Sequence, residues 1–132
     1  MAKTFQCTLI TPQEQLLDQE VTYASIPAWD GLVGIEPQRA AMVIKLGNGP
    51  LRLDMEDGSS QSYFVGGGFA QMKDNRLSLL TEETIAAGDV NLEEAQASLA
   101  QAQAREAVDE QEVASRDREL SRARAMVQIA SK

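Results

Sequence analysis

The chain has 132 residues, 43% of them hydrophobic, which suits one folded domain or one domain with an appendage. Its 20 acidic residues outnumber its 12 basic ones and leave a formal net charge of -8, which disfavours nucleic acid and anionic membrane surfaces as partners. The sequence has no histidine, so it lacks the commonest general base and metal ligand. We therefore expect no catalytic residues and no metal site.

No apolar run approaches the roughly 20 residues that a membrane-spanning helix needs, so direct membrane insertion is not expected. The first residues also lack the long apolar segment of a secretory signal. The single cysteine, Cys7, cannot form an internal disulfide, and we expect it to be a small core residue.

The first part of the chain has the patterns of β-strands. Residues 3–10 alternate between apolar and polar side chains, which predicts a half-buried strand. A turn is expected at 11–14, and an apolar segment resumes after it with the two leucines at 16 and 17. The β-branched and aromatic residues of 21–27 then predict a second long strand.

Residues 30–40 read Asp-Gly-Leu-Val-Gly-Ile-Glu-Pro-Gln-Arg-Ala. Glycine adopts backbone angles that are closed to other residues, and proline removes a hydrogen-bond donor. The segment therefore predicts an ordered, shaped loop rather than a strand. Such a loop is most often a corner between two β-rich segments.

Short strands and turns alternate beyond this segment. The cluster at 47–50 predicts a turn, and the three glycines at 66–68 predict an interruption. No helix and no lysine-hydroxyl pair follow 66–68, so a bulge or close backbone contact is favoured over a phosphate-binding loop. The expected strands are 41–46, 51–56, 61–65, 69–72 and 77–80. This spacing is typical of a sandwich or barrel.

The period becomes helical after Gly88. Asn91 and Asp109 are each followed three positions later by a glutamate, which predicts two N-caps and hence two helices. We expect these helices to form an antiparallel hairpin.

The seam between the two predicted helices is thin. Burying one large apolar side chain contributes ~1.5–3 kcal/mol, which over a few such residues is modest against the entropy of ordering the whole segment. We therefore predict that the hairpin is marginally stable alone and is the mobile part of the protein. Its large aliphatic residues are Leu92, Leu99, Val113, Leu120 and Val127.

Three segments together carry a family resemblance. Gly31–Met42 follows a pattern of the form Gly-x-Leu-Gly-Ile-x-Pro-Gly-His-Ala-Pro-Leu, with Gln38-Arg39 in place of Gly-His and Ala41 in place of proline. Residues 64–69 read Phe-Val-Gly-Gly-Gly-Phe, and residues 80–85 read Leu-Thr-Glu-Glu-Thr-Ile. Over nearly its whole length, the chain resembles the epsilon subunit of the F-type ATP synthase, the counterpart of mitochondrial delta.

The resemblance implies a mainly β plus α fold, with a β-sandwich domain at 1–88 and an α-helical hairpin domain at 89–132. It implies a non-catalytic subunit of the central stalk of a proton- or sodium-translocating enzyme. The implied partners are the gamma subunit, the membrane ring of c subunits and, through the hairpin, the catalytic alpha/beta head. The implied location is peripheral, on the cytoplasmic face of the inner (plasma) membrane.

The resemblance also implies site residues. Gly31, Leu32 and Arg39 become candidate contacts with the rotor ring and stalk, against the alternative of a buried corner. Arg118 and Arg122 become candidate contacts with an acidic segment of the catalytic subunits, restraining ATP hydrolysis. The alternative for this pair is a solvated helix face with local charge pairs to Glu112, Asp117 and Glu119. The acidic pair Glu82-Glu83 is interpreted as solvated surface.

Some members of this family bind ATP between the helices through a pattern like Leu-Asp-x-x-Arg-Ala. The same place reads Leu-Glu-Glu-Ala-Gln-Ala at 92–97, so Glu93 replaces the aspartate and Gln96 the arginine. Losing the guanidinium removes a strong phosphate-matching donor. We therefore predict no tight ATP binding and no cofactor.

Two other classes of function stay open at this point. The first is a free-standing β-sandwich adaptor whose helical tail binds an unrelated partner. The second is a small hydrolase with a carboxylate-only mechanism, although no spacing of acidic residues singles out a catalytic pair.

Overall fold

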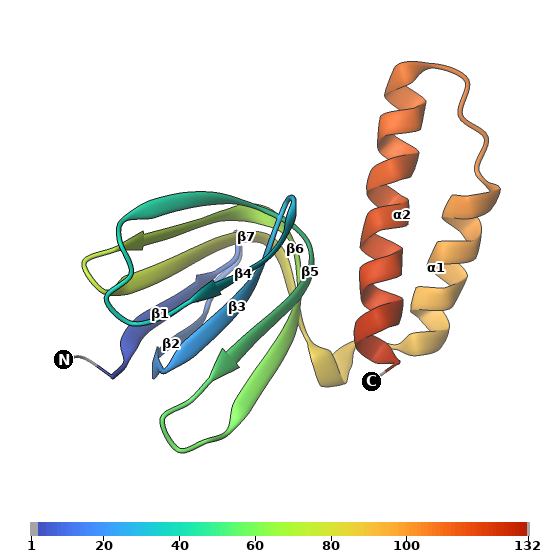
Figure 1. The fold of residues 1–132 in the computed structure, drawn as a ribbon. Coiled ribbons are helices and arrows are strands. Elements are labelled where there is room, and N and C mark those ends of the chain that lie inside the picture. Colours follow the sequence, from blue (N-terminus) through green and yellow to red (C-terminus); the bar gives the residue numbers. More distant parts are fainter. Residues whose placement is uncertain (1–2, 132) are drawn as a thin grey trace.

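A computed structural model describes residues 3–131, in which a strongly curved β-sheet is followed by two helices (Figure 1). This confirms the predicted fold class. The strands are β1 Phe5–Ile10, β2 Gln15–Val21, β3 Tyr23–Ala28, β4 Gly31–Ile35, β5 Met42–Asp54, β6 Ser60–Lys73 and β7 Arg76–Ala86. After the short 3-10 helix η1, Ala87–Asp89, come α1 Leu92–Ala104 and α2 Glu110–Ala130. The outer ends of the two predicted domains, residues 1, 2 and 132, lie outside the described residues.

The sheet folds over on itself. Its strand order is β2-β1-β7-β6-β5-β3-β4, and β1 and β7 form its parallel pair. At about 4.8 Å per strand, the two edges of a flat sheet of this size would lie about 29 Å apart. Yet Leu17 on β2 and Ile35 on β4 belong to the same buried cluster, together with residues from every other strand. The curved sheet therefore encloses one core, to which Phe5, Cys7 and Leu9 contribute as their alternation predicts.

The central strands β5 and β6 run unbroken through both glycine clusters, so the turn predicted at 47–50 is wrong. Leu46 pairs with Gly68 and Asn48 with Gly66, without a shift in register. The interruption predicted at 66–68 is likewise wrong as a break, and a bulge is excluded because no extra residue is inserted.

The glycines of β6 instead change which side chains point inward. Gly67 and Gly68 have positive φ angles of 76° and 115°. Val65 is buried before them, whereas Ala70 and Met72 are buried after them, so the alternation changes phase across the glycines. This change allows one continuous strand to serve both layers of the folded sheet.

The segment predicted as a loop at 30–40 is a strand over its first half. β4 pairs antiparallel with β3, from Ala28 opposite Gly31 to Ala24 opposite Ile35. An edge strand needs hydrogen bonds on one side only, and the proline that disfavours a strand lies beyond it, at position 37. The predicted strand at 21–27 is also divided, because Thr22 bends the chain by donating from its amide and hydroxyl to the Asp54 carbonyl oxygen.

Both helix N-caps are confirmed. The Glu94 amide donates to the Asn91 side chain at 3.0 Å, and the Glu112 amide donates to the Asp109 side chain at 2.8 Å. The helices run antiparallel beside the sheet (Figure 1). Among the described residues, neither helix is long and apolar enough to cross a membrane.

The hairpin rests on a small second cluster outside the main core. Phe64 of β6 is fully buried there beneath the helices, against Ala95 of α1 and Ala125 and Met126 of α2. All five large aliphatic residues predicted for the interhelical seam are only half-buried, while alanines fill its buried positions. The seam between the helices therefore buries little large apolar surface, as its sequence predicts.

Candidate functional site

Arg122 on α2 and Glu83 on β7 form the principal ion pair between the hairpin and the sheet. The Arg122 Nε donates to Glu83 Oε1 and its Nη2 to Glu83 Oε2, both at 2.7 Å. The Arg122 guanidinium also lies 5.9 Å from the centre of the Phe64 ring. The hydrogen bonds that Arg122 donates to Glu83 raise the pKa of Arg122 above its ordinary value. Glu83 is thus not the solvated surface residue expected from the sequence.

Arg118 lies one turn earlier on α2 and differs from Arg122. Its side chain is exposed, and it makes no ion pair with any residue of 3–131. It borders an open groove between α2 and the sheet, which Trp29 and Phe69 also line. Of the local partners expected for these arginines, Glu119 is taken by Arg105, whose Nη1 lies 2.8 Å from Glu119 Oε1. Of the two predicted head contacts, only Arg118 makes no ion pair within residues 3–131.

A row of exposed apolar side chains crosses the outer face of the sheet and continues from this groove. Phe69 on β6 lies opposite Leu80 on β7 and opposite Lys45 on β5. The Trp29 amide donates to the Lys45 carbonyl oxygen at 2.9 Å, which brings Trp29 to the end of the row. Trp29, Phe69 and Leu80 are 69%, 55% and 51% exposed. We call Trp29, Phe69 and Leu80 the outer-face row.

The sequence-based interpretation missed the outer-face row, although one signal was present. Leu79 and Leu80 are consecutive, and neighbouring residues of a strand point to opposite faces. One of the two must therefore face outward, and it is Leu80, because Leu79 is fully buried. The pairing of Leu80 with Phe69 was not visible, because it depends on the register between β6 and β7.

The three residues predicted as ring or stalk contacts lie along one edge of the sheet but do not form one cluster. Gly31 and Leu32 are in β4, and the Leu32 side chain is 63% exposed. Arg39 lies in the loop beyond the other end of β4, where its Nη1 donates to the Gly34 carbonyl oxygen at 3.0 Å. Leu32 is thus an exposed residue of an edge strand and not the tip of a loop.

The loop that carries Arg39 is held in place by the turn between β6 and β7. Gln38 has a positive φ of 64°, and its amide donates to Asn75 Oδ1 at 2.8 Å. The Asn75 side chain in turn donates to the Thr4 carbonyl oxygen at 2.9 Å. These bonds join three segments distant in sequence and give the loop a defined shape.

A small cavity lies where the resemblance places ATP in some relatives. It has a volume of about 200 Å³, below the roughly 300–1,000 Å³ of typical ligand pockets. Asp89 and Glu94 line it, and the cation among its lining residues is Arg122, which Glu83 already holds. Glu93 and Gln96, which replace the residues of the ATP pattern, do not line it. This composition is unfavourable for a polyphosphate.

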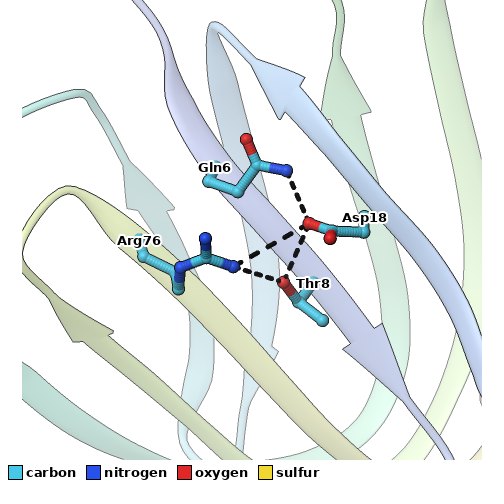
Figure 2. A network of polar contacts seen from close by, with 4 residues as sticks. All are labelled: Gln6, Thr8, Asp18 and Arg76. Atoms are coloured by element: carbon cyan, nitrogen blue, oxygen red, sulfur yellow. Dashed lines mark hydrogen bonds and ion pairs between the residues drawn. The ribbon is translucent and has the colours of Figure 1, made fainter.

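A separate polar network joins three strands at the opposite edge of the sheet (Figure 2). Asp18 Oδ1 on β2 accepts hydrogen bonds from Gln6 and Thr8 of β1. Arg76 Nη1 on β7 donates to Thr8 Oγ1 at 3.2 Å and lies 3.8 Å from Asp18 Oδ1. The network links the edge strand to the parallel pair. Within residues 3–131, no cluster of acidic or cysteine side chains is arranged to hold a metal.

Comparison of the sequence with known proteins finds one family across most of the chain. Residues 4–87 match the model of the β-sandwich domain of the ATP synthase delta/epsilon chain. The ATP synthase epsilon chain of Rhodopirellula baltica is 37% identical over 99 residues, which cover 75% of this chain and 77% of that protein. The epsilon chain of Granulibacter bethesdensis is 31% identical over 134 residues, which cover 98% of each.

Comparison of the fold finds chains from two mitochondrial ATP synthases. One comes from a structure of the Euglena gracilis enzyme that contains OSCP, F1 and the c-ring, with a TM-score of 0.87 and 22% identity over 96% of this chain and 81% of that chain. The other comes from the central stalk and c-ring of the Tetrahymena thermophila enzyme, with a TM-score of 0.75 and 14% identity over 95% of each chain. At these identities the likeness is one of fold.

Proposed function

This chain belongs to the delta/epsilon-chain family of ATP synthase subunits, and from that membership we propose that it is a non-catalytic subunit of the enzyme's central stalk. In this role residues 1–88 bind the gamma subunit and sit on the membrane ring of c subunits, coupling the stalk to the rotor. Residues 89–132 form a regulatory arm. The subunit is peripheral, on the cytoplasmic face of the inner (plasma) membrane, and reaches the membrane only through the ring.

The observation that carries the stalk-binding role is the outer-face row. Clustered exposed apolar side chains on a soluble protein commonly mark an interaction site, and in this row Lys45 lies between Trp29 and Phe69. Trp29 is 69% exposed and Phe69 55%, and aromatic residues of this kind often anchor protein interfaces. We assign the row to the gamma subunit, because membership of this family implies that the chain binds the central stalk.

Three further residues are assigned to the ring. Leu32 offers an exposed apolar side chain on the β4 edge, and Arg39 offers a cation on a loop of defined shape. Gly31, at the start of β4, is also exposed. Gly31 follows the turn that contains Trp29, so this edge meets the outer-face row at one end.

The hairpin is assigned a regulatory role because its contact with the sheet is thin. The docked form buries few large side chains, so undocking exposes little apolar surface. In an extended form along the stalk, Arg118 and Arg122 contact the catalytic head and suppress wasteful ATP hydrolysis. In the docked form this contact is absent.

The stalk-binding role is tested by co-expressing the full chain with the gamma subunit and measuring their co-purification. Phe69→Lys places a charge in the row, and we expect it to reduce capture of gamma at least tenfold. Val108→Lys is the matched control, because Val108 is 89% exposed in the loop between the helices, away from the row. Equal capture of gamma by both variants and the wild type would refute the assignment of the row.

The regulatory role is tested in the assembled enzyme. ATPase activity is compared with and without residues 89–132. We expect activity to rise when the hairpin is removed. Unchanged activity would remove the inhibitory role while leaving the structural role intact.

A further inference from the structure

We propose that the pair formed by Arg122 and Glu83 is a latch that holds the hairpin on the sheet, and that it withholds Arg122 from the catalytic head until it opens. The proposal rests on the proposed function, from which it takes the movement of the hairpin. It adds the contact that sets the resting position of the arm. It also separates the roles of the two arginines.

The geometry commits the Nε–Nη2 edge of the Arg122 guanidinium to Glu83. Its Nε and Nη2 both donate to the Glu83 carboxylate at 2.7 Å, so this edge of the planar guanidinium is fully engaged. Charge-assisted bidentate pairs of this kind are strong and directional. A second carboxylate cannot bind to the same edge until Glu83 leaves. The latch must therefore open before Arg122 makes an equivalent contact elsewhere.

The surroundings make the latch a large share of the docking contact. Phe64 lies beneath the Arg122 guanidinium and is fully buried, which favours the cation over its ring. The other buried residues of the hairpin in this cluster are two alanines and one methionine. One further polar contact is a 3.2 Å hydrogen bond from Asn48 Nδ2 to Ser121 Oγ. Val127 and Ile129 of the hairpin pack half-buried against the same cluster, so few other polar interactions oppose release.

The latch is also exposed enough to be reversible. The Arg122 and Glu83 side chains are 41% and 36% exposed, so water and salt reach both. Partial exposure weakens the attraction between the two charges, because water and salt screen it. A contact of this strength permits opening when the hairpin meets a competing acidic surface.

The two arginines are predicted to behave differently. Glu83→Gln opens the latch but leaves both arginines available to the head. Arg118→Gln leaves the latch closed, since Arg118 has no ion pair within the described residues, but removes a head contact. Arg122→Gln removes the latch and a head contact together.

The latch is tested first on the free full-length protein by amide hydrogen exchange. In Glu83→Gln we expect exchange in α2 to become faster by on the order of five- to tenfold, with no change in β1, because a charge-assisted bond is lost from a partly exposed site. Glu82→Gln is the matched control, since Glu82 is exposed and makes no ion pair in the part of the chain described. Exchange in Glu83→Gln equal to that of the wild type would overturn the latch.

A double-mutant cycle decides whether the two residues act on each other. If they form one interaction, exchange in the Glu83→Gln/Arg122→Gln variant is no faster than in the faster of the two single variants. If the two single effects multiply, the residues act independently and the proposal is overturned. Neither result depends on the rest of the ATP synthase.

A second measurement separates the latch from the inhibitory role. In the assembled enzyme we expect Glu83→Gln to lower ATPase activity and Arg118→Gln to raise it. Faster exchange in Glu83→Gln with unchanged ATPase activity would support the latch and count against inhibition. Unchanged exchange would overturn the latch whatever the ATPase activity.

Discussion

Gly68 of β6 lies against the carbonyl oxygen of Leu80 on the neighbouring antiparallel strand β7. A β-carbon at position 68 would collide with this oxygen and would lie 2.8 Å from the Thr81 α-carbon. Gly68 also has a φ of 115°, a region that L side chains rarely adopt. The two strands can pass this closely only because no side chain intervenes.

Gly68→Ala is therefore expected to destabilise the sandwich by about 2–4 kcal/mol, since backbone strain and overpacking add. Gly58→Ala is the matched control, because Gly58 also has a positive φ, 89°, but a β-carbon there meets no atom within 4 Å. We expect the control to cost about 1 kcal/mol through backbone strain alone. Urea unfolding of both variants measures the difference, and equal losses would contradict the role of the Leu80 contact.

This relationship illustrates which part of the fold the sequence predicts. Alternation identified β1 well, because burial of Phe5, Cys7 and Leu9 depends only on the local period. The same reasoning placed a turn at 47–50, because glycine clusters look alike whether the chain reverses or merely bends. The difference lies in the pairing of Leu46 with Gly68, which is a contact between distant residues.

The residues of the candidate site also divide into those that local sequence patterns identify and those that depend on distant contacts. Arg118 and Arg122 were identified through their spacing on α2 and the family resemblance, which are properties of nearby residues. Glu83 was interpreted as solvated surface, because its partner lies 39 positions away. The docking of α2 against the sheet creates that pair, and no local pattern in the sequence encodes it.

We expect the free protein to bind ATP no more tightly than about 1 mM, the weak end of the affinity range. Asp89 and Glu94 line the cavity that would receive the phosphates, and Arg122 is engaged by Glu83. Isothermal titration of the full chain measures this, and Glu83→Gln serves as the control in which Arg122 is released. A micromolar dissociation constant for the wild type would show the prediction to be wrong.

The sandwich is expected to fold without the hairpin. The main core contains strand residues alone, and it shares no buried residue with the cluster around Phe64. Truncation after Gly88 exposes the Phe64 ring, so Phe64→Ser is expected to be nearly neutral in the truncated chain but to weaken hairpin docking in the full chain. Urea unfolding of the truncated chain is expected to be cooperative, and a non-cooperative transition would contradict the proposed division at 88/89.

Leu32→Asp is expected to weaken association with the c ring about tenfold, which corresponds to about 1.4 kcal/mol. Leu32 is 63% exposed on the β4 edge, so a charge there disrupts an apolar contact without disturbing the core. Leu16→Asp is the matched control, because Leu16 is 39% exposed on β2, the other edge strand. Co-purification with the ring measures both, and equal retention would remove Leu32 from the proposed contacts.

Cys7 is expected to make the stability of the protein fall at high pH. Burial, with a smaller contribution from the Asp18 charge, raises the pKa of its thiol from 9.0 to about 12. Between these values the folded state keeps a proton that the unfolded state has lost. By linkage, the free energy of unfolding must decrease as pH rises through this range, by at most about 1.4 kcal/mol per pH unit.

The measurement is urea unfolding of the wild type and of Cys7→Ala between pH 8 and 11. The substitution leaves a small cavity and lowers stability at every pH, but it removes the titrating thiol. The difference in unfolding free energy between the two proteins should therefore shrink as pH rises. A difference that stays constant over this range would mean that the Cys7 thiol ionises equally in the folded and unfolded states. That result would contradict the effect expected from its complete burial on β1.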